Sequence, residues 1–238
     1  MPLERRWTRH GLILLLSTLF STTALRATPV AIALAVSDSR FGLLNKAALP
    51  LAVRWIVAVL VLDFTRYAVH WCLHATRLWH VHQVHHSDPD FDVSTGARVH
   101  PLEVMVLQGA NIATIALLAP PVSAVLFVEL ASAVQSFFSH ANVSLPPSID
   151  RWLHWLFVTP DMHRIHHSAQ VAEQSRNFSD VFGFWDHMFG TYLAEPASGH
   201  EQMMVGLEEC QDESSLGIGW MLMRPFRGTG PMVRSRSQ

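Results

Sequence analysis

The sequence is poor in charged residues and in cysteine. Charged residues make up 15% of its 238 positions and hydrophobic residues 50%, whereas a soluble domain is usually about 25% charged. Seventeen basic and nineteen acidic residues leave a formal net charge of −2, too small to attract a polyanion strongly. Two cysteines, Cys72 and Cys210, cannot form the disulfide framework of a small secreted protein. These deficits argue against a disordered chain, a nucleic-acid-binding protein and a disulfide scaffold, and they favour a membrane protein.

Several common catalytic motifs are also missing. The sequence has no His-Glu-x-x-His, no Gly-x-Ser-x-Gly, no Walker loop and no Rossmann glycine pattern. It therefore carries no visible nucleotide or flavin site and no zinc-protease helix of the usual type. Its one excess is histidine, with 15 in all. Thirteen of these fall between His70 and His187.

Apolar runs predict about four membrane segments. An 18-residue helix is about 27 Å long, close to the thickness of the hydrocarbon layer. The first run follows arginines at positions 5, 6 and 9 and is interrupted at Arg26 and Pro29, so one span, two spans, a re-entrant stretch or a cleaved signal peptide would each fit. The runs cover residues 11–25 with 30–36, then 47–62, 102–119 and 122–138.

Pro120 and Pro121 separate the last two runs and predict a hairpin turn, because neither residue can continue a helix. The histidines before residue 102 and those from His140 onward would then meet on one side of the membrane. Three polar residues lie at one depth from that side: Arg54 is 11 residues from position 65, Asn111 is 11 from His100, and Glu129 is 11 from His140. A charge at this depth is costly unless it is paired, so we expect an Arg54–Glu129 ion pair supported by Asn111. In the alternative, Arg54 reaches the interface and Glu129 is protonated.

Three histidine clusters have the spacing of metal ligands. Residues at i, i+3 and i+4 share one face of a helix, so each cluster would direct its imidazoles to a common point. Eight histidines exceed the three or four ligands of one zinc site, which favours two metals. Imidazole is a suitable ligand for zinc, copper, iron or nickel. The alternative to metal binding is that the clusters form a buried hydrogen-bonded network or an adventitious histidine-rich tract. The clusters are His70 with His74, His82 with His85 and His86, and His163 with His166 and His167.

Further residues and short runs accompany the histidine clusters, namely Asp63, Leu78-Trp79, the run from His82 to Asp88, Asp92-Val93, Thr95, Arg98, His100-Pro101-Leu102-Glu103, His140-Ala-Asn142, the run from Thr159 to Ser168, Asn177 and the run from Trp185 to Tyr192. In this order they resemble the motifs of the fatty acid hydroxylase and sterol desaturase superfamily, and the similarity covers residues 40–210. It implies an all-α fold, in which an integral membrane helical bundle is capped by a helical, histidine-rich dimetal domain. We expect a single domain over residues 1–238, with 227–238 as a mobile tail.

The resemblance also implies the site residues. As metal ligands it implies the eight clustered histidines and, as a ninth, His140 just after the last membrane segment. Residues that support the ligands from behind are implied to be Asp63, His100, Glu103, Asn177 and Asp186. Seven residues separate His74 from His82, where eight is common in the family. A helical linker of that length would rotate His74 by about 100° relative to the second cluster. Ser179 also departs from the family, which often has Asn-aromatic-Gly here.

The resulting functional hypothesis is a di-iron membrane oxidoreductase that uses O2 to hydroxylate or desaturate a lipid, either a fatty acyl chain or a sterol-like or isoprenoid-like substrate. Zinc has no redox chemistry with O2, which favours iron. Electrons would come from a separate reductase or ferredoxin-like donor. A membrane zinc hydrolase and a non-enzymatic metal-binding or haem-binding membrane protein remain as alternatives. The histidine face is expected to be cytoplasmic, because it carries five arginines, namely Arg66, Arg77, Arg98, Arg151 and Arg164.

Overall fold

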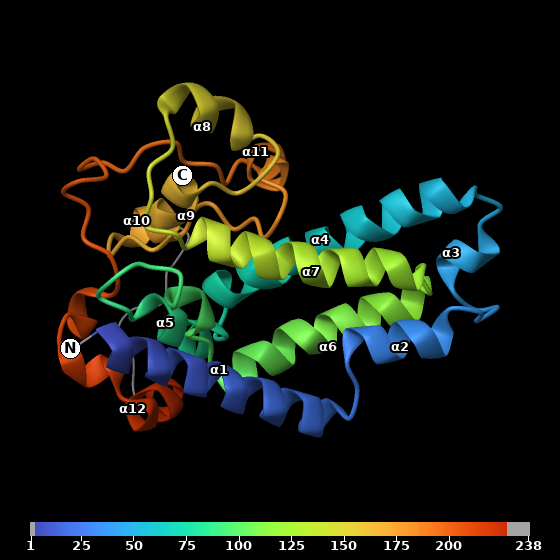
Figure 1. The fold of residues 1–238 in the computed structure, drawn as a ribbon, viewed down its shortest axis with the longest axis horizontal. Coiled ribbons are helices and arrows are strands. Elements are labelled where there is room, and N and C mark those ends of the chain that lie inside the picture. The colour runs from blue at the N-terminus through green and yellow to red at the C-terminus, as the bar shows by residue number, and fades with distance from the viewer. Residues whose placement is uncertain (1–2, 228–238) are drawn as a thin grey trace.

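The computed structural model describes residues 3–227 and is built from helices (Figure 1). In that part of the chain no strand forms, and the one β-type contact is an isolated bridge between Ser168 and Val205. The α-helices are α1 (Leu3–Leu25), α2 (Pro29–Val36), α3 (Leu43–Lys46), α4 (Leu51–Ala75), α5 (Trp79–His86), α6 (Pro101–Leu118), α7 (Val122–Ser139), α8 (Pro147–Leu153), α9 (Pro160–His166), α10 (Val171–Gln174), α11 (Phe184–Phe189) and α12 (Ile218–Met223). Short 3-10 helices cover Thr95–Ala97, Glu208–Cys210, Glu213–Leu216 and Arg224–Phe226.

Four helical segments are long and apolar enough to cross a membrane, which confirms the predicted bundle. They are Leu3–Val36, formed by α1 and α2, and then α4, α6 and α7. Figure 1 shows these helices side by side along the long axis, with α5, α8, α9, α10 and α11 gathered at one end. Many large apolar side chains on the bundle are exposed, such as Leu15 at 54% and Leu130 at 66%. This is the surface expected for contact with lipid, and the helices at one end form the predicted cap.

The hairpin between α6 and α7 turns where it was predicted. Helix α6 ends at Leu118. Its C-capping residue, Ala119, takes a left-handed conformation with φ of 47°, and Pro121 then precedes the first residue of α7. Gly42 packs against this turn, where an added Cβ would lie 2.1 Å from the Ala119 Cβ. The hairpin returns the start of α6 and the end of α7 to the same end of the bundle (Figure 1).

Helix α1 buries a polar face. Arg6, His10, Ser17 and Ser21 are each at most 2% exposed. The Arg6 guanidinium donates to Asp88 through Nε at 3.1 Å and Nη2 at 2.6 Å. His10 contacts the Ser94 hydroxyl through Nδ1 at 2.9 Å, and the Ser17 hydroxyl donates to a backbone carbonyl in the same loop. The first helix is therefore attached to the loop that follows α5.

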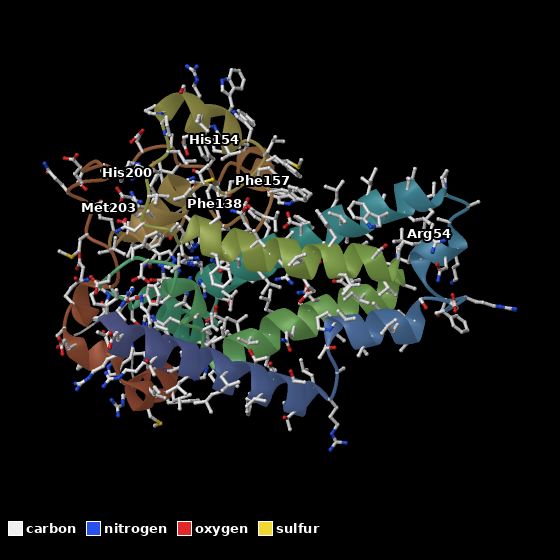
Figure 2. All side chains as sticks on the ribbon, in the orientation of Figure 1. Arg54, Phe138, His154, Phe157, His200 and Met203 are labelled. Carbon is white, nitrogen blue, oxygen red and sulfur yellow. The ribbon has the colours of Figure 1, made fainter. Side chains whose placement is uncertain are left out.

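The predicted Arg54–Glu129 ion pair is wrong. Arg54 donates to the side chain of Asn45 near the far end of the bundle (Figure 2), whereas Glu129 accepts a 2.5 Å hydrogen bond from Arg66. The predicted depth of Arg54 took residue 65 as the histidine-bearing end of its helix. Helix α4 instead continues to Ala75, so Arg66 is the arginine that lies level with Glu129. The Asn111 side-chain oxygen is buried without a hydrogen-bond partner among the described residues.

The predicted tail, residues 227–238, lies outside the described residues except for Arg227. The single-domain organisation stays a prediction.

Candidate metal centre

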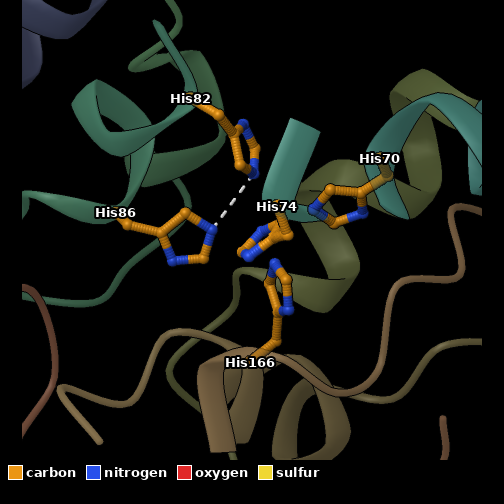
Figure 3. Close-up of side chains that lie close together, drawn as sticks. All are labelled: His70, His74, His82, His86 and His166. Atoms are coloured by element: carbon orange, nitrogen blue, oxygen red, sulfur yellow. Dashed lines mark hydrogen bonds between the residues drawn. The ribbon is translucent and has the colours of Figure 1, made fainter. Parts of the chain in front are cut away.

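Nine histidines lie in two groups at the capped end of the bundle. Within each group, one ring nitrogen of every histidine lies within 4.8 Å of the corresponding nitrogens of the others. Group I, drawn in Figure 3, consists of His70, His74, His82, His86 and His166. Group II consists of His85, His140, His163 and His167.

Helices α5 and α9 each contribute to both groups. On α5, His82 and His86 lie one turn apart and face group I, while His85 faces group II. On α9, His166 faces group I, and His163 with the C-capping His167 faces group II. Helix α4 adds His70 and His74 to group I, and His140 at the C-terminal end of α7 completes group II.

Hydrogen bonds to main-chain carbonyls orient three of the rings. Nδ1 of His70 lies 2.8 Å from the Phe178 carbonyl and Nδ1 of His166 lies 2.7 Å from the Arg176 carbonyl. Nδ1 of His140 lies 2.8 Å from the Ser136 carbonyl. Because a carbonyl can only accept, each Nδ1 carries the proton, and Nε2 keeps its lone pair for the interior of the group.

The donor set fits metal ions. In group II, the Nε2 atoms of His140 and His163 lie 3.0 Å apart. In group I, the Nε2 atoms of His82 and His86 lie 3.1 Å apart. Several other ring nitrogens are buried and have no hydrogen-bond partner within residues 3–227, including Nε2 of His70 and of His166 and both nitrogens of His74 and His167. Buried polar atoms normally find a partner, and bound cations between the rings would supply one.

The buried rings outside the membrane helices are held neutral. Burial lowers the pKa of His82 to about 3 and that of His140 to about 4. Burial likewise places the pKa of His86, His163 and His167 well below its ordinary value. A neutral imidazole is the form that binds metal.

The structure brings together all nine histidines for which a ligand role was predicted. That role itself stays a prediction. The short spacing between His74 and His82 does not rotate His74 out of place. Helix α4 ends at Ala75, Thr76 is extended, and α5 begins only at Trp79, so the linker is not a continuous helix.

Of the five predicted supporting residues, Glu103 contacts a histidine ring directly and Asp186 contacts the backbone behind one. The Glu103 carboxylate lies 2.8 Å from Nδ1 of His82. Asp186 accepts from the backbone N–H groups of Phe178 and Ser179. Asp186 therefore holds the segment whose Phe178 carbonyl binds His70.

Asp63, Asn177 and His100 act farther from the rings. Asp63 accepts from Trp185 Nε1 at 2.8 Å and from two neighbouring backbone N–H groups. Asn177, with φ of 57°, donates to backbone carbonyls on either side of its loop. His100 caps α6, accepting from the Leu102 N–H through Nδ1, and is in neither group.

A cavity of about 200 Å³ lies against both groups. Its wall includes His70 and His82 of group I and His85, His140 and His163 of group II. The cavity is therefore the space through which a molecule could reach both groups at once. Its remaining lining comes from Arg66, Leu73, Gly96, Val99, Glu103, Leu107, Ser132, Ser136, Ser139, Ser179 and Asp180.

Three of the arginines expected on the histidine face are buried. Arg66 and Arg164 are each 8% exposed and Arg98 is 0% exposed. Arg98 donates to the carbonyls of Val84 and Ser87, which flank His85 and His86. Arg98 therefore supports α5 from inside, and of the five arginines Arg77 and Arg151 are exposed. The cytoplasmic orientation of this face stays a prediction.

Comparison with known proteins places these residues in context. The model of the fatty acid hydroxylase family matches residues 55–191. The chain is 27% identical over 148 residues to ornithine lipid hydroxylase OlsE of Rhizobium tropici, covering 62% of this chain and 44% of that protein. It is 30% identical over 156 residues to alkylglycerol monooxygenase of Homo sapiens, covering 64% and 33%.

A third relative is very-long-chain aldehyde decarbonylase GL1-11 of Oryza sativa subsp. indica, 30% identical over 130 residues, with coverage of 54% and 48%. The chain thus spans less than half the length of each of these relatives. No solved structure matches the chain.

Proposed function

Because this chain belongs to the fatty acid hydroxylase family, we propose that it is an oxidoreductase that uses O2 to hydroxylate or desaturate a lipid. The chain is an integral membrane protein with four apolar helical segments. The observation that carries the proposal is the pair of buried histidine groups at one end of this bundle, all within the matched residues 55–191. The names of the bacterial and human relatives, a lipid hydroxylase and a monooxygenase, support the same reaction class.

The five histidines of group I would hold one iron, and the four histidines of group II would hold a second. Iron would supply the redox chemistry with O2 that breaking an unactivated C–H bond requires, and zinc would not. The protein's contribution is to fix neutral imidazoles in place. Glu103 holds the His82 ring from behind, and the Phe178, Arg176 and Ser136 carbonyls do so for three others.

The overall reaction must balance in electrons and protons. Hydroxylation converts a C–H bond, O2, two electrons and two protons into C–OH and water. Desaturation removes two hydrogens from the chain and sends both oxygen atoms to water, again with two electrons from outside. We propose that a separate reductase or ferredoxin-like protein supplies these electrons, since the sequence has no flavin motif and no cysteine motif for an iron–sulfur cluster.

We also propose that the capped end faces the cytoplasm. Arg5 at the start of α1, Arg77 and Arg151 are exposed at this end, and an excess of arginine and lysine marks cytoplasmic loops. The same positive charges would favour a donor with an acidic surface.

The test combines metal analysis with lipid profiling. We expect purified protein to carry about two irons per chain without a haem Soret band, and host cells that express it to accumulate one oxidised lipid. That lipid should vanish with His166→Ala, because His166 belongs to group I, and persist with His154→Ala, because His154 lies outside both groups. Stoichiometric zinc in place of iron, or an unchanged lipid profile in His166→Ala, would reject the proposal.

A further inference from the structure

Large apolar side chains are exposed on one side of the cap, over α8, the turn that follows it and α11. This surface, the α8–α11 patch, consists of Ile149, Trp152, Trp155, Leu156, Met188 and Phe189. Trp152 is 70% exposed and Met188 is 64% exposed. Figure 1 shows α8 and α11 at the capped end, to one side of the long axis of the bundle. A contiguous apolar patch of this kind marks a surface that contacts a partner or a membrane.

Helices α8 and α11 are joined to each other. The backbone N–H of Gly183, next to the first residue of α11, donates to the Leu156 carbonyl at 3.2 Å. The Trp155 ring stacks on the His187 ring of α11, with centroids 3.8 Å apart. The two helices therefore present their apolar side chains as one surface.

Helix α11 also packs against a membrane helix. The Phe189 ring contacts the rings of Phe64 and Tyr67 on α4, with centroids 5.6 Å and 5.4 Å apart. An apolar groove of about 350 Å³ lies at this junction and is lined by Trp71 of α4, which is itself exposed. The patch is therefore continuous with the apolar surface of a helix that spans the membrane.

The junction with α4 lies inside the membrane span. The Thr65 hydroxyl is 3.2 Å from that of Thr114, which is 13 residues, or about 20 Å, from the capped end of α6. Arg66 donates to the Ser132 hydroxyl at 3.0 Å, and Ser132 is seven residues, or about 10 Å, from the capped end of α7. Residues 64–67 thus lie about 10–20 Å inside the span, and α11 reaches this level.

The polar groups beside the patch are those of a membrane interface. The Arg151 guanidinium lies 5.8 Å from the centre of the Trp152 ring. Nδ1 of His154 lies 3.1 Å from the Tyr192 hydroxyl and 3.8 Å from the Asp150 carboxylate. Tryptophan, tyrosine and arginine are favoured at the level of lipid headgroups, because each combines an apolar body with a polar end. Helix α8 has the composition of an amphipathic interfacial segment.

We propose that the α8–α11 patch is a membrane-binding surface. Met188 and Phe189 contact the acyl chains of the bilayer, and α8 lies at the level of the headgroups. The occupant is the bilayer that surrounds the four spans, because the patch continues the surface of α4 and reaches the depth of residues 64–67. One side of the cap is then embedded in lipid and the other side is in water. The inference concerns how the cap is placed and does not depend on the reaction.

Fluorescent labels on single cysteines test this placement. Cys72 and Cys210 are first replaced by alanine, and one new cysteine is introduced as Met188→Cys or as Met204→Cys. The two positions are a matched pair, because Met204 is another exposed methionine of the cap, at 55%. Figure 2 shows its neighbour Met203 on the side of the cap away from Phe157, which follows the patch residue Leu156. Each variant carries an environment-sensitive NBD label and is reconstituted in liposomes.

Quenching measures whether each label lies in lipid or in water. We expect the label at Met188→Cys to be quenched several-fold more strongly by lipids brominated on their acyl chains than by aqueous iodide. The label at Met204→Cys should show the opposite preference. Trp152→Cys should respond best to bromine near the carbonyl end of the acyl chain, because α8 lies at the headgroup level. All three positions are exposed, so the midpoint of thermal unfolding should stay that of the parent, which confirms that each variant is folded.

Three results would overturn the inference. The first is the same ratio of lipid to iodide quenching at Met188→Cys and Met204→Cys. The second is quenching of the Met188→Cys label by iodide and not by brominated lipid. The third is a label at Met188→Cys that neither quencher reaches, since a second copy of the chain or another protein would then cover the patch. None of these measurements involves the metals or a reaction product, so they succeed or fail separately from the proposed function.

Discussion

Replacing Arg6 with alanine should destabilise the protein far more than replacing its neighbour Arg5. The Arg6 side chain is 2% exposed and donates to Asp88 twice and to the Thr95 hydroxyl at 3.1 Å. Asp88 is itself 1% exposed, so the substitution leaves a buried carboxylate without its cation. Removal of one partner from a buried ion pair typically costs about 3–5 kcal/mol. Arg5 is exposed, and its replacement should cost no more than about 0.5 kcal/mol.

These free energies convert into a measurable shift. In a chain of this size, 1 kcal/mol changes the midpoint of thermal unfolding by about 2–4 °C. Arg6→Ala should therefore lower the midpoint by about 6–20 °C, and Arg5→Ala by about 2 °C at most. The assay is thermal unfolding in one detergent at a fixed heating rate, because membrane proteins often unfold irreversibly. Metal content of the same samples shows whether the histidine groups loosen with the loop.

A second substitution tests the cause. Asp88→Asn added to Arg6→Ala removes the unpaired charge while keeping the bond from Thr95, which lies 2.9 Å from Asp88 Oδ2. The double variant should recover part of the lost midpoint. The reasoning is refuted if Arg5→Ala and Arg6→Ala give the same shift, or if the double variant is no more stable than Arg6→Ala alone.

Three further predictions concern other parts of the molecule. Glu103→Leu should weaken metal binding about 10–100-fold, because His82 loses its carboxylate partner, whereas Glu103→Gln, which keeps an acceptor, should stay within a few-fold in a chelator competition. Burial raises the pKa of the Cys210 thiol to about 11 from an ordinary value near 9, so the folded chain keeps this proton between those values and the unfolded chain loses it. Stability should fall as pH rises through this window, less so in Cys210→Ala, and iodoacetamide at pH 8 should label Cys210 slowly until the protein is unfolded. Gly183→Ala should cost about 1–3 kcal/mol, because the new Cβ would lie 2.2 Å from the His154 carbonyl, whereas Gly219→Ala meets nothing within 4 Å and should unfold at or above the original midpoint.

The sequence predicted the bundle and the meeting of the histidines because both follow from local pattern. Length and apolarity identify a membrane helix, and a spacing of i, i+3 and i+4 places side chains on one face wherever the helix goes. Pro120 and Pro121 then required a reversal, and the ends of α6 and α7 converged.

Relations between helices were not predictable in the same way. Arg54 and Arg66 both lie on α4, and only the axial offset between α4 and α7 decides which of them meets Glu129. That offset depends on where α4 ends, and Ala75 carries no strong stop signal. His100 and Glu103 both lie at the start of α6, but only Glu103 contacts a histidine of the two groups, namely His82. The two side chains leave the helix axis in different directions, and the sequence does not show which of them faces the histidines.

The main-chain carbonyls that accept hydrogen bonds from the histidines could not be predicted from the sequence. The carbonyls of Phe178, Arg176 and Ser136 orient three of the rings, and every residue type has a carbonyl. The arginines at the start of α1 were equally ambiguous, since a charge that directs membrane insertion and a charge buried against Asp88 look alike in one sequence.

Helices α5 and α9 each serve both histidine groups, and this sharing bears on how the protein would acquire its cofactor. A metal bound in one group would fix the two helices that also carry histidines of the other group, so the first ion would favour binding of the second. Cells short of metal would then contain a mixture of empty and complete molecules, with few carrying a single ion. A shortage of metal would lower the number of fully loaded molecules and leave the activity of each loaded molecule unchanged.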